Sequence, residues 1–273
     1  MIYPKDFEQL IRSTNAPDFI GWGNPNAKIL LLGKEPAIDL GKEGGRIQYE
    51  TEVKHNRADW SENIAQQTGF DDVVAQWGIY GNPLCPHGWQ KYRVTNLDKD
   101  GNYPEGKEGT ARTWYQYQKL TDMIFGKTLG RDDFLDFHKY CFSTDMSDIA
   151  ALESSRTEPE KTKTSIEERK RFFSHDFFKR FPIIIAAVSH YPKKYAGDIY
   201  FKDTFDVEWM QQKSDGTPGA WINVNEDAGT PRLLLHTCQF SASLSDEYFE
   251  RIAALVRNFA DEYNLNLAPD SSL

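Results

Sequence analysis

The sequence predicts an α/β protein with a three-layer αβα architecture: a mostly parallel, four-stranded sheet with helices on both faces. Four short apolar runs lead to this prediction, at Lys28–Gly33, Tyr140–Thr144, Pro182–Val188 and Arg232–His236. Uninterrupted apolar runs of this length are typical of strands that are buried on both faces, as in parallel sheets. The segments between them show helical spacing of apolar residues, and such alternation favours a parallel sheet covered by helices.

The first half of the chain divides into five expected elements. Phe7–Arg12 is amphipathic and is expected to form a helix, and Lys28–Gly33 is the first buried strand. The glycine-rich segment 41–45 is expected to be a flexible loop, because its spacing matches no phosphate-binding fingerprint. Ala58–Trp77 is expected to be helical. Asn82–Gly109 is dense in Gly, Pro, Asn and Asp, which indicates a long inserted surface loop.

The middle of the chain is expected to contain two further helices around the second strand. Thr110–Phe125 has apolar residues at helical spacing, with Thr110 or Thr113 as the capping residue. The Tyr140–Thr144 strand follows. The pattern Ser165-x-x-Glu168 is a capping signature, so a helix is expected from Ser165 to Arg180.

The last third contains the remaining two strands, an insertion and the closing helix. Pro182–Val188 is the clearest strand of the sequence. The segment 195–229 is expected to be an insertion with short strands at Ile199–Phe201 and Trp221–Val224, because these runs are β-prone. After the strand Arg232–His236, a helix is expected over Asp246–Tyr263 with Ser245 as its cap. The whole chain, 1–273, is expected to form one domain.

Composition excludes several classes of protein. Hydrophobic residues make up 39% of the 273 residues, which is enough for a sizeable core and argues against general disorder. No apolar run is long enough to cross a bilayer, and the first ten residues lack the apolar region of a secretory signal. Three scattered cysteines argue against a disulfide framework, so a cytoplasmic location is expected. The net charge of −9 argues against tight duplex binding, although a local phosphate-contacting patch stays possible. The charged stretch 160–171 fits a solvated helix face or such a patch.

Polar and ionisable groups follow each apolar run. Gly33-Lys-Glu-Pro36 follows the first strand, Asp145 the second, Ser189-His190 the third, and His236-Thr-Cys-Gln-Phe-Ser241 ends the fourth. In an open parallel sheet, ligands bind beyond the carboxyl ends of the strands, where the strand order reverses. These four segments are therefore expected to converge on one functional edge.

The first and last of these segments resemble the two signature motifs of the uracil-DNA glycosylase superfamily. Ile29-Leu-Leu-Leu-Gly33-Lys-Glu-Pro36 resembles the family's apolar strand running into a Gly-x-x-Pro turn. Arg232-Leu-Leu-Leu-His236-Thr-Cys-Gln-Phe-Ser241 is similar to the family's strand and histidine loop of the His-Pro-Ser type. Tyr140–Asp145 and Phe173–Val188 resemble the elements between them. The order of elements agrees from about Lys28 to Phe259, but only short motifs match.

The resemblance implies roles for individual residues. Glu35 would position or activate the attacking water and oppose the positive charge on a sugar whose base leaves. His236 would stabilise the negative charge on the departing base. Gly33 would let the backbone approach an extruded nucleotide, and Pro36 would stiffen the turn. The other residues expected to contact the base or the nucleic acid are Lys34, Asp145, Gln239, Phe240 and Ser241.

Departures from the family pattern bear on the substrate. Asp145 stands where the family often has an asparagine that reads uracil, and an ionised aspartate can only accept hydrogen bonds. A base with an amino group at that edge would suit an ionised Asp145 better than uracil. Thr237 and Cys238 replace the Pro-Ser of the usual histidine loop. The cysteines lack cluster spacing and Cys85-Pro-His87 has too few convergent partners, so no metal and no cofactor are expected.

The sequence thus predicts a DNA glycosylase-like hydrolase acting on an extruded nucleobase, with Glu35 and His236 as its catalytic residues. Its partner would be DNA, single-stranded or damaged, or a free nucleotide. Two alternatives stay open: a non-catalytic nucleotide-binding or nucleic-acid-binding member of the same fold, and a small-molecule hydrolase on another doubly wound sheet. Glu35 and His236 also fit structural roles as an ion-pairing carboxylate and a buried, hydrogen-bonded histidine.

Overall fold

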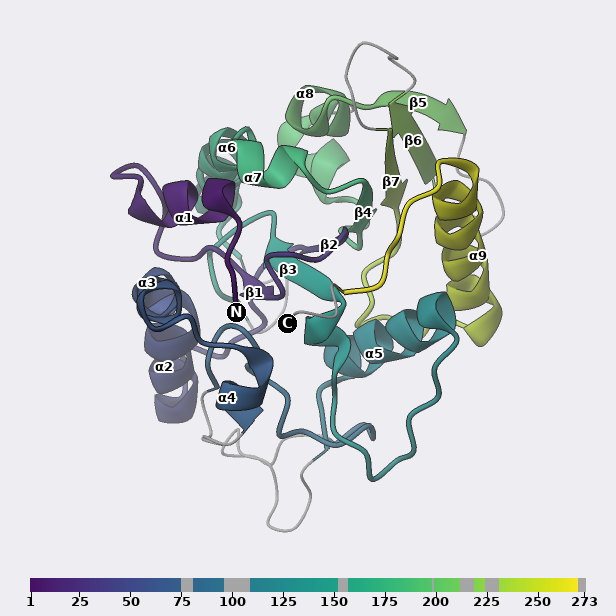
Figure 1. Ribbon diagram of the computed structural model, residues 1–273. Helices are drawn as coiled ribbons and strands as arrows, with labels where there is room; N and C mark the ends of the chain where they lie inside the picture. The colour runs from purple at the N-terminus through teal and green to yellow at the C-terminus, as the bar shows by residue number, and fades with distance from the viewer. Residues whose placement is uncertain are drawn as a thin grey trace.

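A seven-stranded mixed sheet forms the centre of the molecule. The computed structural model describes residues 1–74, 81–95, 109–151, 157–197, 199–211, 219–223 and 231–269. The strands lie in the order β1-β3-β2-β4-β7-β6-β5. Their bounds are β1 (Trp22–Gly23), β2 (Ile29–Gly33), β3 (Cys141–Asp145), β4 (Ile183–Ala186), β5 (Glu208–Gln211), β6 (Gly219–Asn223) and β7 (Arg232–His236). Helices cover both faces of this sheet (Figure 1).

The four central strands are the four that the sequence predicts. β3, β2, β4 and β7 pair in parallel, with Leu32 opposite Thr144 on one side and Ala186 on the other, and Ala186 opposite His236. Antiparallel strands extend both edges: β1 pairs with β3, and β6 and β5 continue beyond β7. The predicted four-stranded sheet is therefore the parallel core of a larger sheet. The inserted segment 195–229 supplies two of the added strands.

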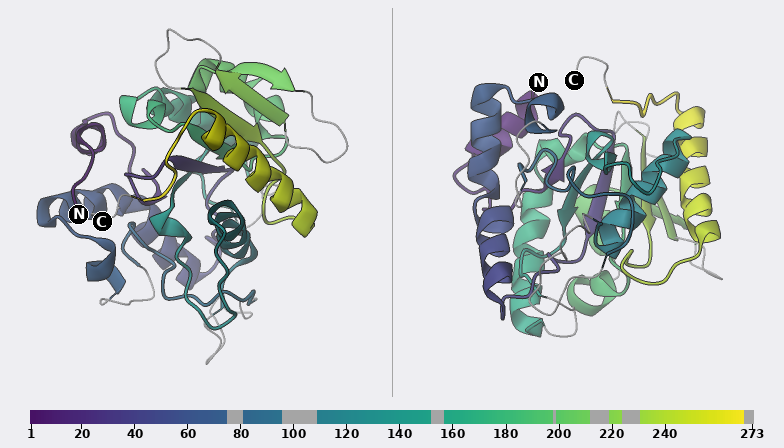
Figure 2. Two further views of the ribbon diagram at one scale, coloured as in Figure 1. Left: turned by 45° about the vertical axis from the view of Figure 1, so that its right-hand side comes forward. Right: turned by 90° about the horizontal axis from the view of Figure 1, so that it is seen from below.

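The two faces of the sheet carry different helices (Figure 2). Leu30 and Leu32 of β2 pack on one side, in the core shared with α1 (Lys5–Arg12), α6 (Pro159–Phe173), α7 (Asp176–Lys179) and α8 (Tyr200–Phe205). Ile29 and Leu31 pack on the other side, against α5 (Arg112–Phe125) and α9 (Asp246–Glu262). Because successive strand residues point to opposite faces, β2 must be apolar at every position, as its sequence is.

The remaining helices lie between β2 and α5 in the chain. They are α2 (Glu43–Tyr49), the π-helix η1 (Glu50–Lys54), α3 (Asn56–Gln66) and α4 (Phe70–Val74), with short η2 (Phe137–Lys139) and η4 (Pro192–Ala196) elsewhere. The prediction of a loop at 41–45 is wrong in part, because Gly44 and Gly45 belong to α2. A Cβ on Gly45 would lie 2.0 Å from the carbonyl oxygen of Asp39, so glycine allows the first turn of α2 to approach this backbone.

Three other local predictions are wrong. Ile199–Phe201 is not a strand, because α8 begins at Tyr200 and buries Tyr200, Phe201, Thr204 and Phe205. The helix expected from Ser165 begins earlier, at Pro159, and Ser165 lies buried inside α6. Neither Thr110 nor Thr113 caps α5, whose capping residue is Ala111. The predicted cap of α9 is confirmed, because the Ser245 hydroxyl accepts a hydrogen bond from the Tyr248 N–H.

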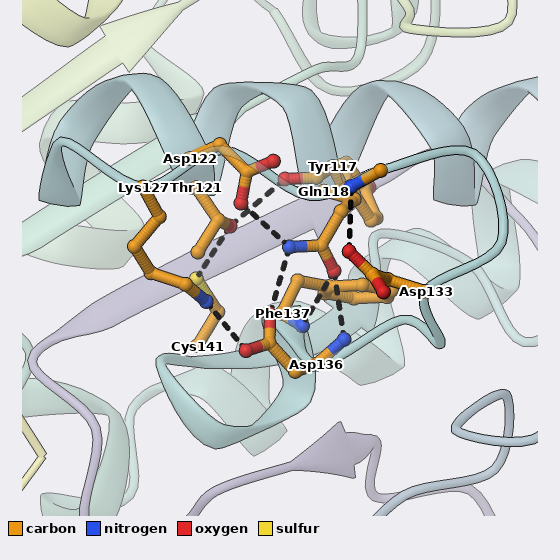
Figure 3. Close-up of polar contacts among 10 residues, drawn as sticks. Tyr117, Gln118, Thr121, Asp122, Lys127, Asp133, Asp136, Phe137 and Cys141 are labelled. Carbon is orange, nitrogen blue, oxygen red and sulfur yellow. Dashed lines mark hydrogen bonds and ion pairs between the residues drawn. The ribbon is translucent and has the colours of Figure 1, made fainter. Parts of the chain in front are cut away.

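A polar network fixes α5 to the segment before β3 (Figure 3). The Gln118 amide donates to the carboxylates of Asp122 and Asp136, both at 2.8 Å, and its oxygen accepts from the N–H groups of Asp136 and Phe137. The Thr121 hydroxyl bonds the carbonyl oxygen of Tyr117 at 2.8 Å. Because buried, satisfied networks restrict movement, they hold the α5 side chains in place over the sheet.

Two predicted regions lie partly outside the described residues. In the expected loop 82–109, residues 96–108 are not described, and the described part contains only isolated bridges such as Val94 with Thr110. In the insertion, residues 198, 212–218 and 224–230 are not described. Across the described ranges, no helix is both long and apolar enough to cross a membrane.

Candidate functional site

The candidate site lies at the carboxyl edge of the parallel strands. From β2 the strand order continues to β3 on one side and to β4 and β7 on the other. The order therefore reverses between β2 and β4, and this reversal opens a crevice beyond the strand ends in doubly wound sheets. Gly33, Asp145, Ser189 and His236 are at or just beyond the ends of the four parallel strands, as the sequence predicts.

Asp145 and Gly33 are neighbours in register at this edge. A Cβ on Gly33 would lie 2.1 Å from Oδ1 of Asp145 and 3.6 Å from the hydroxyl oxygen of Tyr117. The space beside Gly33 is thus filled by the Asp145 carboxylate, with the Tyr117 phenol next to it. The Asp145 carboxylate thus occupies the direction in which a side chain at position 33 would point, and close approach of a nucleotide to the Gly33 backbone stays a prediction.

Asp145 is a buried carboxyl group in an environment that disfavours its charge. Its side chain is 8% exposed. Burial raises the pKa of Asp145 to about 7, the Arg169 guanidinium opposes this rise, and the Glu35 carboxylate adds to it. A carboxyl group with this pKa is about half protonated at neutral pH. It can then donate a hydrogen bond as well as accept one.

Lys34 joins the two motifs that the sequence places at opposite ends of the chain. Its ammonium donates a hydrogen bond to Oε1 of Gln239 and lies 4.8 Å from the ring centroid of Tyr191. Burial lowers the pKa of Lys34, which the Glu35 carboxylate opposes and Lys194 reinforces. The loop after β2 and the loop after β7 therefore converge, with Glu35 beside Lys34 and Asp145.

The loop after β7 is fastened to the end of β4 through Ser189. The imidazole Nε2 of His236 lies 2.6 Å from the Ser189 carbonyl oxygen, and the Ser189 hydroxyl accepts from the Gln239 N–H at 2.8 Å. Because a carbonyl oxygen only accepts, Nε2 of His236 carries the proton of this bond. Ser189 has φ of +50°, an uncommon conformation for a residue other than glycine. The His236 ring also packs edge-on against Phe201 at 5.1 Å.

The other predicted site residues differ in how buried they are. Phe240 does not reach the crevice: it is 1% exposed and packs against Tyr117 and Phe249, so its expected contact with nucleic acid is wrong. Pro36 is buried at the start of the loop, whereas Ser241 is exposed in a turn. That Glu35 and His236 face each other across one cavity stays a prediction. In the structure Glu35 lies near Lys34 and Asp145, and His236 contacts Ser189 and Phe201.

Positive charge gathers near the carboxyl edge of the parallel strands, on the segment after β4. His190 is largely exposed. The partial burial of its ring, followed by the nearby charges of Lys34 and Lys194, lowers its pKa. Lys194 lies 4.6 Å from the ring centroid of Tyr195, and Lys193 is its neighbour in the chain. This cluster is a local basic patch on an acidic protein, of the kind that contacts phosphate groups.

Sequence reasoning missed two residues of the site. Arg169 lies in the stretch 160–171, which is expected to be a solvated helix face or a phosphate-contacting patch, yet it is 2% exposed and hydrogen-bonded to the end of β3. The helical spacing of this stretch indicates the burial of Arg169, because the residue lies on the same stripe of α6 as Ile166, Phe172 and Phe173. Tyr117 lies within the expected helix Thr110–Phe125, and the position of its hydroxyl near Gly33 follows only from the tertiary structure.

Two buried histidines lie away from this edge without forming a metal centre. Sγ of Cys85 lies 4.0 Å from Nδ1 of His138, and the rings of His87 and His138 are 5.8 Å apart. Among the residues described, no group of three His, Cys, Asp or Glu side chains is arranged to hold a metal ion. These histidines are packed among aromatic rings, including Trp114 at 4.4 Å from His87.

Comparison of the sequence with protein-family models and with curated proteins finds no match. The function is therefore inferred from the geometry of the site.

Proposed function

We propose that this protein hydrolyses the N-glycosidic bond of a nucleobase bound beyond the carboxyl ends of β2 and β3. The carboxyl pair Glu35 and Asp145 is the single observation that carries the proposal. These groups interact electrostatically, and burial holds the pKa of Asp145 near 7. Neighbouring carboxyl groups in different environments are the arrangement that glycoside hydrolysis uses, one as the acid and the other as the anion.

The two carboxyl groups have separate roles in this reaction. Protonated Asp145 donates a hydrogen bond to the carbonyl oxygen of the base, where negative charge collects as the glycosidic bond breaks. Glu35 holds the attacking water through its side-chain oxygens and stabilises the positive charge that develops on the sugar. Water adds to the sugar carbon, its proton passes to Glu35, and the base leaves with the proton it gains from the site or the solvent.

The protonation of Asp145 also bears on which base fits. A neutral carboxyl group offers one donor and one acceptor, which complements the C=O and N–H edge of uracil or hypoxanthine. Only the ionised form, which accepts alone, disfavours that edge. The objection to uracil that follows from an ionised aspartate therefore applies above about pH 7 and not below it.

The basic patch at Lys34, Lys193 and Lys194 supports a substrate that carries phosphate. It lies beside the crevice on a chain whose net charge is −9. Local attraction of this kind favours a few phosphate contacts over tight binding along a duplex. A single strand, an extruded nucleotide or a free nucleotide meets this requirement.

A non-catalytic binding protein is the second candidate. One observation favours it: the Nε2 proton of His236 is directed to the carbonyl oxygen of Ser189. That proton is then not available to stabilise a leaving base in this conformation. Such a protein would bind nucleotides through the same crevice without turnover.

The test offers the purified protein single- and double-stranded oligonucleotides that contain uracil, hypoxanthine, xanthine or alkylated bases, and the matching free nucleosides and nucleotides. Abasic sites or free base are expected, with losses of about 100-fold or more in Glu35→Gln and Asp145→Asn. Glu167→Gln, on the exposed face of α6, is the matched control and should keep full activity. Binding without base release by the wild type would replace this proposal with the second candidate.

A further inference from the structure

Arg169 is a buried cation tied to the strand that carries Asp145. Its side chain is 2% exposed and packs within about 5 Å of three phenylalanine rings, the nearest being Phe172 at 4.6 Å. Nε donates to the carbonyl oxygen of Asp145 at 2.8 Å, and one terminal nitrogen donates to the Thr144 hydroxyl at 2.6 Å. The other terminal nitrogen donates to the carbonyl oxygen of Phe19 at 2.6 Å. Every direct hydrogen-bond partner is neutral.

We infer that Arg169 is a positioning residue for Asp145, which holds the end of β3 so that the Asp145 carboxyl lies against Gly33, and which sets the charge state of that carboxyl group. This inference rests on the proposed function for its chemical meaning. The fork of the guanidinium spans β3, at Thr144 and Asp145, and the segment before β1, at Phe19. Lysine cannot reproduce this, since it lacks the planar fork.

The charge state of Asp145 follows from the groups around the two side chains. Asp145 faces Arg169 from α6, Glu35 from the loop after β2 and Tyr117 from α5. Arg169 faces Asp148 and Asp145 from the β3 end and Tyr200 from α8. Arg169 lowers the pKa of Asp145 against the effects of burial and of Glu35. An opposite charge at close range typically lowers a carboxyl pKa by about one to three units, so its loss should raise the Asp145 titration by at least about one unit.

A cavity of about 600 Å³ has Arg169 among the residues that line it. Asp148 and Glu168 contribute carboxylates to its wall, and the chain near the carboxyl ends of α1 and α6 lines it at Leu10, Ser13 and Phe172. Carboxylates and helix carboxyl ends both attract cations. A guanidinium ion from solution can therefore enter the space that a truncated Arg169 leaves.

The experiment follows the Asp145 carboxyl by ¹³C NMR between pH 4 and 9, in the full chain and without substrate. In Arg169→Met the titration midpoint should rise by at least about one unit, and guanidinium chloride at tens of millimolar should move it back toward the wild-type value. Arg171→Met is the matched control: Arg171 lines the same cavity but is exposed, so the midpoint should stay unchanged. Because no activity is measured, the result is independent of whether the protein releases a base.

An Arg169→Met protein that folds and titrates like the wild type would overturn the inference, and so would a raised midpoint that guanidinium leaves unmoved. Should this variant fail to fold, Arg169→Lys decides. Lysine keeps a positive charge but lacks the fork that donates to the Asp145 carbonyl oxygen, the Thr144 hydroxyl and the Phe19 carbonyl oxygen. The Asp145 midpoint should therefore move away from the wild-type value, and a midpoint equal to the wild type would refute the inference.

Discussion

The replacement of Asp145 by asparagine should stabilise the protein at alkaline pH while it lowers the rate of base release about 100-fold or more. Asparagine has nearly the shape of the protonated carboxyl group but never ionises. The wild-type carboxyl group is 8% exposed, and burial raises its pKa from 3.8 to about 7. The native state therefore binds this proton more tightly than the unfolded state does. Stability due to Asp145 is fully present below about pH 4 and is lost as the pH rises toward 7.

The magnitude follows from the same two pKa values. A difference of one pKa unit corresponds to about 1.4 kcal/mol. Integration over the window gives a loss of about 2 kcal/mol at pH 5 and about 4 kcal/mol at pH 8, relative to a group that stays neutral. The advantage of Asp145→Asn over the wild type should therefore grow by about 2–3 kcal/mol between pH 5 and pH 8. Any pH-independent effect of the amide cancels in this comparison.

The assay is urea-induced unfolding of both proteins at pH 5 and pH 8, followed by tryptophan fluorescence and by far-UV circular dichroism. Coincident transitions by the two probes support two-state analysis. Asp261→Asn, at an exposed position near the end of α9, is the control and should show no pH-dependent difference. If the free-energy difference between Asp145→Asn and the wild type is equal at both pH values, Asp145 is not a buried, proton-binding group. If Asp145→Asn is more stable than the wild type but releases less base, the aspartate is retained for activity at the expense of stability.

Other substitutions test separate parts of the account. Gly33→Ala places a methyl group 2.1 Å from the Asp145 carboxylate, so it should displace that group and reduce base release at least about tenfold, measured at a pH where Asp145 is protonated; wild-type rates would contradict the assigned contact. Phe240→Ala should lower the free energy of unfolding by about 3–5 kcal/mol in urea titrations, and a loss under about 1 kcal/mol would mean that the ring is not a core group. Burial lowers the pKa of His87 from 6.5 to about 3, so His87→Gln should remove about 1.4 kcal/mol of destabilisation per pH unit as the pH falls below 6.5. An acid-unfolding curve that His87→Gln leaves unshifted would refute this.

The parallel core of the fold was predictable because its signal is local. Each central strand is an unbroken apolar run, and each run ends at or within two residues of the predicted position. The added edge strands gave weaker signals: β1 has only two residues, and β5 was not predicted at all. Ile199–Phe201 is β-prone in composition, but the burial of Thr204 and Phe205 one turn later makes it part of a helix. Tertiary packing decided this segment.

The candidate site was predictable in position but not in its internal contacts. The rule that ligands bind beyond the strand ends located Lys34, Glu35 and Asp145 correctly at one edge. The rule says nothing about which of these groups touch, and the structure joins Lys34 to Gln239 and His236 to Ser189. The charge state of Asp145 also depends on burial and on Arg169, neither of which is visible in the sequence near residue 145.

The central claim is that base release needs the protonated form of Asp145. The pH dependence of single-turnover base release between pH 5 and pH 9 tests it most directly. The account predicts a rate that falls toward tenfold per pH unit above about pH 7, and an Asp145→Asn variant whose residual rate shows no such fall. A wild-type rate that stays level or rises from pH 7 to pH 9 would contradict it.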